Sequence, residues 1–142
     1  MADSARLVVV STANQDEAGS IARALVEERL AACVNILGPV RSLYRWQGSV
    51  EQQGEFLMLI KTAARCWPAL ERRVRELHSY QVPEIIALPL CRSSRRYLAW
   101  LLSEVGPERC QAGGRSDKTR RERRNPALRQ GQSPRRGSRR PA

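Results

Sequence analysis

One short segment of the chain combines side chains that could bind a metal ion. It contains His78, the only histidine in the sequence, followed closely by Tyr80 and Glu84. Copper and similar divalent ions prefer imidazole or sulfur ligands, to which oxygen donors can be added. His78 is therefore a candidate metal ligand. The alternative is that His78 ends a helix, where an imidazolium ring is stabilised by the helix dipole.

Two charged residues mark the ends of an apolar run that could lie beside this segment. Glu55 begins the run and Lys61 ends it, whereas Glu84 precedes a second apolar stretch. If neighbouring strands bring these charges together, they could bind a small anionic molecule or form a structural ion pair. We predict a ligand pocket formed by Glu55, Lys61, Tyr80, Glu84 and Trp46, although an aromatic residue such as Trp46 more often packs on a hairpin face.

Sequence signatures of the common enzyme classes do not occur in the chain. It has no G-x-S-x-G nucleophile motif, no phosphate-binding Walker loop and no dinucleotide-binding fingerprint. A single histidine cannot build the usual metal-hydrolase site. We therefore predict a binding protein without enzymatic activity.

The four cysteines, Cys33, Cys66, Cys91 and Cys110, are spread singly along the chain. They form no C-x-x-C pair, and no histidine follows them at zinc-finger spacing. We expect no structural zinc site and no disulfide framework, which favours a reducing compartment. Cys33 is expected to be a small buried residue, Cys66 to be at the surface or half-buried, and Cys110 to be an exposed, oxidisable thiol.

The net charge of +11 is unevenly distributed. Residues 107–142 hold 12 basic and 3 acidic side chains, a net charge of +9, and residues 1–106 carry the remaining +2. Because the C-terminal part has almost no large apolar side chain, we predict a folded domain over 1–106 and a disordered Arg-rich tail over 107–142. Such a tail favours nonspecific, salt-sensitive contact with polyanions. No apolar run suits a membrane span or a secretory signal, so we expect a cytoplasmic protein.

The candidate site residues must be positioned by alternating strands and helices. Short apolar runs predict strands, and apolar residues spaced at three and four predict helices. The expected order is a strand at 7–10, a helix capped by Asn14 and Glu17, a strand at 33–36 continuing to 46, a strand at 55–61, a helix from Pro68, a strand at 85–88 and a short helix capped by Ser94. This order predicts an α+β fold, a ferredoxin-like split βαβ sandwich with an antiparallel sheet, a long β-hairpin turning at Gln47 and Gly48, and a C-terminal helix.

Both faces of the strand at 55–61 are apolar. Phe56, Met58 and Ile60 share one face, and Leu57 and Leu59 share the other. Two helices cover only one face of such a sheet, and the short chain provides no third layer. We therefore expect the second face to be covered by self-association.

Several segments, taken in order, resemble the CutA divalent-cation-tolerance family. They are Leu30–Ile36, Ser42–Gly48, Glu55–Thr62, His78–Ile85 and Tyr97–Leu101. The resemblance implies a homotrimer assembled through long hairpin strands, binding of copper or another divalent cation, and a role in metal tolerance. Some relatives carry a cysteine and a second histidine at positions that correspond here to Ser11 and Leu77. The resemblance therefore implies that the metal is weakly bound.

Two functions follow from these observations. The first is a cytoplasmic homotrimeric divalent-metal-binding protein of the CutA type. The second uses the architectural similarity of that family to the trimeric PII signalling proteins. It is a regulatory or scaffold trimer that binds a small anion at subunit clefts, or polyanions through its basic tails.

Overall fold

The computed structural model describes residues 4–106 and residue 110. In chain order the elements are β1 (Ala5–Thr12), α1 (Gln15–Glu27), β2 (Cys33–Trp46), β3 (Ser49–Ala63), the 3-10 helix η1 (Ala64–Cys66), α2 (Trp67–Leu77), β4 (Ile85–Pro89) and α3 (Arg95–Glu104). This order confirms the predicted α+β, ferredoxin-like class. Apart from Cys110, the tail predicted over 107–142 lies outside the described residues.

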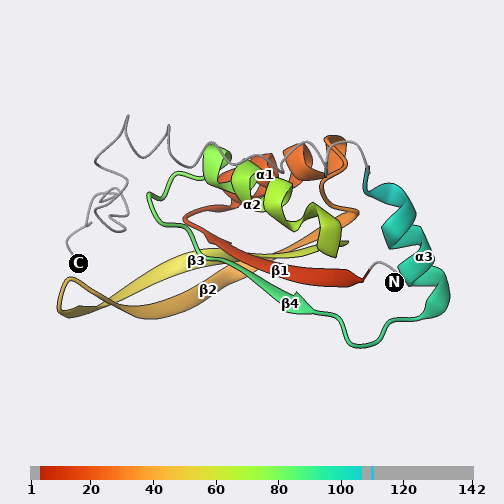
Figure 1. Cartoon of the computed structure of the whole chain (residues 1–142). Helices are drawn as coiled ribbons and strands as arrows, with labels where there is room; N and C mark the ends of the chain where they lie inside the picture. Colours follow the sequence, from red (N-terminus) through yellow and green to blue (C-terminus); the bar gives the residue numbers. More distant parts are fainter. Residues whose placement is uncertain (1–3, 107–109, 111–142) are drawn as a thin grey trace.

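The four strands form one antiparallel sheet in the order β2-β3-β1-β4. α1 and α2 lie on the same face of this sheet, and α3 stands at its end (Figure 1). β1 and β3 are the central strands, as the predicted arrangement requires. Among the described residues, no helix is long and apolar enough to cross a membrane.

β2 and β3 form a long hairpin with the predicted turn. Gln47 and Gly48 have positive φ angles of 46° and 82°, as a two-residue type I′ turn requires. The pairing with β3 changes register between Leu37 and Val40. Gly38 and Pro39 therefore lie at a bulge within one continuous strand, as the predicted continuation from 33–36 to 46 requires.

The core lies between the sheet and the two helices above it. Val8 pairs with Ile60 and Val10 with Met58, and all four side chains are fully buried. The same cluster contains Ile21 and Leu25 of α1 and Leu70 and Val74 of α2. The predicted burial of Met58 and Ile60 on one strand face is confirmed.

The opposite side of the sheet, here called the uncovered face, is also apolar. Its side chains alternate with the buried ones along each strand. They are Leu7 and Val9 of β1, Leu37 of β2, Leu57 and Leu59 of β3, and Ile86 and Leu88 of β4. Ile86 and Leu88 are 49% and 45% exposed. The predicted second apolar face therefore exists, and its burial by self-association stays a prediction.

Only one of the two predicted capping interactions at the start of α1 is present. The Asn14 side chain accepts a hydrogen bond of 2.8 Å from the backbone N–H of Glu17. The Glu17 carboxylate was expected to return to Asn14 but accepts instead from the backbone N–H and the hydroxyl of Ser79, at 2.7 and 3.0 Å. Glu17 therefore joins the start of α1 to the chain that leaves α2.

Two arginines hold the C-terminal end of α3. Arg29 donates to the carbonyl groups of Glu104 and Ser103, both at 2.9 Å, and Arg65 donates to two further carbonyls of the same region. The last carbonyls of a helix have no partner within it and carry partial negative charge, so guanidinium groups stabilise this end. The cap expected from Ser94 at the other end is not made by its side chain.

The cysteines depart most from the sequence-based expectation. Cys66 and Cys110 form a disulfide across a sequence separation of 44 residues, so the expectation of no disulfide was wrong. Neither sulfur is at the surface, because Cys66 is fully buried and Cys110 is 4% exposed. Cys110 belongs to the core cluster, although it lies beyond the predicted boundary at residue 106. Cys33 and Cys91 are free thiols, half-buried and exposed respectively.

Candidate functional site

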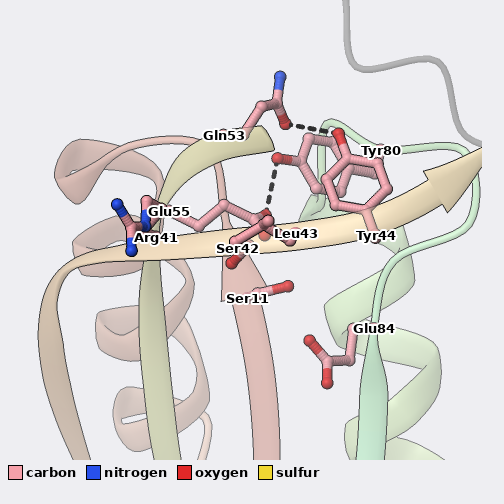
Figure 2. Close-up of a pocket in the computed structure, with 9 residues that line it drawn as sticks. All are labelled: Ser11, Arg41, Ser42, Leu43, Tyr44, Gln53, Glu55, Tyr80 and Glu84. Carbon is pink, nitrogen blue, oxygen red and sulfur yellow. Dashed lines mark hydrogen bonds between the residues drawn. The ribbon is translucent and has the colours of Figure 1, made fainter. Parts of the chain in front are cut away.

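A polar cavity of about 520 Å³ lies at the junction of the hairpin, the end of β1 and the chain that connects α2 to β4. β1 contributes Ser11, the hairpin contributes Arg41, Tyr44, Gln53 and Glu55 among others, and the connection contributes Tyr80 and Glu84 (Figure 2). Three of the five residues predicted for a ligand pocket, Glu55, Tyr80 and Glu84, therefore lie in one cavity. The twist of the long hairpin brings the two strands over the end of the sheet and creates this space.

Glu55 is the buried carboxylate of the cavity. It is 6% exposed, and its Oε2 accepts a hydrogen bond of 3.0 Å from the phenolic oxygen of Tyr80. Burial, together with this hydrogen bond and the negative charge of Glu55, raises the pKa of Tyr80. Tyr80 therefore keeps its proton and remains a hydrogen-bond donor at neutral pH.

A second phenol lies on the hairpin side of the cavity. The Tyr44 hydroxyl donates to Oε1 of Gln53 at 3.0 Å (Figure 2). Burial raises the pKa of Tyr44, and the carboxylates of Glu55 and Glu51 raise it further. Both phenols of the cavity are therefore neutral, and both are oriented by hydrogen bonds to residues of β3.

The charges around the cavity are mainly negative. Glu55 and Glu84 are carboxylates, and Arg41 is the only cationic residue that lines the cavity. Glu84 and Arg41 are exposed, whereas Glu55 is buried. Within the described part of the chain, no arginine, lysine or histidine forms an ion pair with Glu55. The buried negative charge is therefore matched by a neutral donor only.

Lys61 and Trp46, the other two predicted pocket residues, do not line the cavity. Lys61 pairs with Leu7 on β1, four residues and about 13 Å along the strand from Ser11. Its ammonium group hydrogen-bonds the Asn35 side chain and the carbonyl of Leu59. Trp46 ends β2 beside the hairpin turn. The cation expected beside the carboxylates is therefore elsewhere on the sheet.

His78 lies just behind the cavity, with both ring nitrogens engaged. Nε2 is 2.7 Å from the carbonyl oxygen of Ser11, which can only accept, so Nε2 carries the proton. Nδ1 is 3.0 Å from the backbone N–H of Tyr80, so it must present its lone pair. This pattern places a proton on Nε2 and makes Nδ1 the acceptor, with Oε1 of Glu17 also 3.5 Å from Nδ1, and the side chain has no exposed surface.

This bonding gives His78 a structural role. The ring connects the end of α2 to β1 and fixes the backbone of Tyr80, which in turn contacts Glu55. The side chain does not cap α2, because the helix ends on the backbone N–H of His78, which donates to the carbonyl of Val74 at 2.9 Å. Each ring nitrogen would have to give up its own hydrogen bond before it could bind an ion.

The donor set near His78 does not fit a metal centre formed by one subunit. Across residues 4–106 and 110, no three His, Cys, Asp or Glu side chains gather at metal-binding positions. At the two positions where a cysteine and a second histidine were considered, Ser11 provides only a hydroxyl group and Leu77 provides no donor atom. The free thiol of Cys33 lies beside Tyr97, whose pKa is raised by burial and by that thiol.

Sequence reasoning missed several residues of the cavity. Ser11, Arg41 and Gln53 line it, but each is a common residue type in a strand and matches no motif. The available signal was the alternation of Val40, Ser42, Tyr44 and Trp46 along one face of the hairpin, which indicates that Ser42 and Tyr44 point the same way. Figure 2 shows Tyr44 beside Tyr80, and this proximity depends on how the hairpin lies over the rest of the sheet, which the alternation does not reveal.

The chain is similar to proteins of one family over most of its described length. The family described as CutA1 divalent ion tolerance protein matches residues 6–104. The divalent-cation tolerance protein CutA of Thermus thermophilus is 49% identical over 100 residues, which span 70% of this chain and 97% of that relative. Human Protein CutA is 47% identical over 92 residues, 65% of this chain and 51% of the relative. The chain thus spans nearly all of the bacterial relative but about half of the human one.

Solved structures agree with the sequence matches. The structure of the Thermus thermophilus divalent cation tolerance protein superposes with a TM-score of 0.71 at 48% identity, covering 72% of this chain and 99% of that chain. CutA1 from Oryza sativa gives a TM-score of 0.72 at 36% identity, over 73% of this chain and 95% of the other. The matched family region ends before Cys110, so the disulfide joins this region to a residue outside it.

Proposed function

The chain belongs to the CutA1 divalent ion tolerance family, and from this premise we propose that it acts in divalent-cation tolerance as a non-enzymatic homotrimer in the cytoplasm. The relatives are named for tolerance and not for a reaction, which supports a binding function. The uncovered face is the observation that supports the proposed trimer. A row of apolar side chains across all four strands of the sheet is unfavourable in water unless another surface covers it.

The subunit number is tested on the full chain by mass spectrometry under native conditions, with protein purified without added metal. We expect a mass of three chains. A monomeric mass at micromolar concentration would contradict the proposed trimer and the burial of the uncovered face together. The same spectrum reports any small molecule that stays bound.

Binding of copper or another divalent cation is the second part of the proposal. The names of the relatives support it, whereas the bonding of His78 argues that any contact is weak and uses oxygen donors. Calorimetric titration with Cu²⁺ compares the wild type with His78→Ala. Identical isotherms would remove His78 from metal binding, and a loss of binding with retained fold and trimer would place it there.

A second candidate function is favoured by the cavity. A trimer that binds a small molecule needs a space of a few hundred Å³ with a few oriented polar groups, and the cavity beside Glu55 has both. In this alternative the protein is a regulatory or scaffold trimer similar to the PII proteins. The basic residues of 107–142 add nonspecific contact with polyanions, which should disappear when the chain ends after Cys110.

A further inference from the structure

We propose that the cavity beside Glu55 binds a small organic molecule bearing a protonated amine, with the ammonium group at Glu55 and an anionic end, where present, at Arg41. This inference rests on the second candidate function above and names the class of ligand. From the sequence we expected Lys61 to contribute to a pocket for a small anion. The ligand inferred here carries a positive charge instead.

The burial of Glu55 carries the argument. An ionised carboxylate removed from water is unfavourable unless it is paired or fully hydrogen-bonded. Glu55 is 6% exposed, and the partner given by its side-chain contacts is the neutral hydroxyl of Tyr80. A protonated amine supplies the missing positive charge and three N–H donors. One of these can bond Glu55, and the hydroxyl oxygens of the cavity can accept the others.

The cavity disfavours an anion as the group bound beside Glu55. A carboxylate or phosphate placed there would meet the charges of Glu55 and Glu84 without an intervening cation. Tyr80 already donates its only proton to Glu55. Arg41 is the one lining cation, and it is exposed. An anionic group therefore suits only the outer end of a ligand whose inner end is positive.

The cavity is also too large and too poor in donors for a bare divalent ion. Ca²⁺ and Mg²⁺ take six or more oxygen ligands, and the described residues bring no three His, Cys, Asp or Glu side chains together at metal-binding positions. A volume of about 520 Å³ is in the range of pockets that hold small organic ligands. The neutral phenols of Tyr44 and Tyr80 add aromatic surface, which attracts organic cations.

The test is calorimetric titration of the full-chain protein in a buffer without amines, using three probes of matched length. They are butylamine, 4-aminobutyrate and butyrate. We expect the two amines to bind and butyrate not to bind. Glu55→Gln keeps the shape of the side chain and an acceptor for Tyr80, and should weaken amine binding at least tenfold. Glu27→Gln, on an exposed part of α1, is the matched control and should change nothing.

A second variant separates the two ends of the ligand. Arg41→Gln should weaken 4-aminobutyrate and leave butylamine unchanged. Butyrate binding as tight as butylamine binding, no binding of either amine, or unchanged amine affinity in a trimeric Glu55→Gln protein would each overturn the inference. If Glu55→Gln does not assemble, Glu84→Gln is titrated instead and should also weaken the amines. The native mass spectrum of the same wild-type sample separates the inference from the function on which it rests. A small molecule that stays bound to a trimer which binds neither amine would reject this inference and leave small-molecule binding standing.

Discussion

The two faces of the same sheet differ in what the chain itself provides to cover them. On β3, Met58 and Ile60 are fully buried beneath α1 and α2, whereas Leu57 and Leu59 alternate with them and stay half-buried on the uncovered face. Both sets are apolar and both belong to a central strand. The difference shows that hydrophobicity predicts a need for burial but not its source, which on one side is two helices and on the other, in our proposal, is a second copy of the chain.

The covered face should give the largest effect when it is charged. Met58→Glu places a carboxylate among Val10, Ile21 and other core side chains with no partner. Leaving an unpaired charge in the core costs about 3–5 kcal/mol, comparable with the whole stability of a small domain. We expect no soluble folded protein, measured by soluble yield and circular dichroism. Met58→Leu is the control, and a native Met58→Glu spectrum would contradict the assignment of this face.

A charge introduced on the uncovered face should have a different effect. Leu59→Glu keeps the core of the subunit intact but puts a charge on the surface proposed to meet other subunits. We expect a folded monomer in place of the trimer, because a buried unpaired charge weakens the contact by about 3 kcal/mol or more. Light scattering measures the mass and circular dichroism measures the fold, with Leu59→Met as the control. A native Leu59→Glu trimer would show that solvent and not protein covers this face.

The disulfide joins two residues of the core on the covered side. Cys66 precedes α2 and Cys110 packs into the same core. Closing a loop of this length restricts the unfolded chain by up to about 4 kcal/mol in the chain-entropy model. Cys110→Ser should lower the thermal midpoint, while Cys91→Ser, at an exposed free thiol, should not. Thermal unfolding with and without a dithiol reductant checks this, and equal midpoints for Cys110→Ser and the wild type would contradict it.

The smallest effect is expected at the cavity and depends on pH. The folded protein raises the pKa of Tyr80 above the ordinary value of 10.0, so the stabilising contribution is fully present below pH 10 and is lost as the pH rises toward the folded pKa. By pH 11 the loss should be at most about 1 kcal/mol, because solvent screens the half-exposed phenol. Urea unfolding of the wild type and of Tyr80→Phe between pH 9 and pH 11 measures it. Parallel curves for the two proteins would contradict this role of Tyr80.

The sequence predicts much of the fold because local patterns determine it. The alternation of Met58 and Ile60 with Leu57 and Leu59 defines the two faces of β3, and the residues Gln47-Gly48 define the turn. The disulfide could not be predicted, because a pair separated by 44 residues leaves no local signal. The same holds for Glu17, whose partner is Ser79 and not its own helix end.

The candidate site is predicted in part for a related reason. Glu55 and Glu84 were expected together because strand ends meet in such a sheet, and both line one cavity with the predicted Tyr80. Lys61 was grouped with them because it lies on the same strand, yet strand position places it about 13 Å from Ser11 along β1. His78 has the residue type of a ligand, but its hydrogen bonds to Ser11 and Tyr80 depend on tertiary packing. Residue type alone does not reveal such bonds.

The link between Cys66 and Cys110 also determines how mechanical force would travel through the chain. Residues 66–110 form a closed covalent ring that contains α2, β4 and α3. A pull on the C-terminal segment is therefore transmitted at Cys110 directly to Cys66 at the base of α2. β4 and α3 lie within the ring and outside the covalent path that carries this force. Any partner that holds the basic C-terminal residues would pull on the core of the subunit and leave its last strand and helix in place.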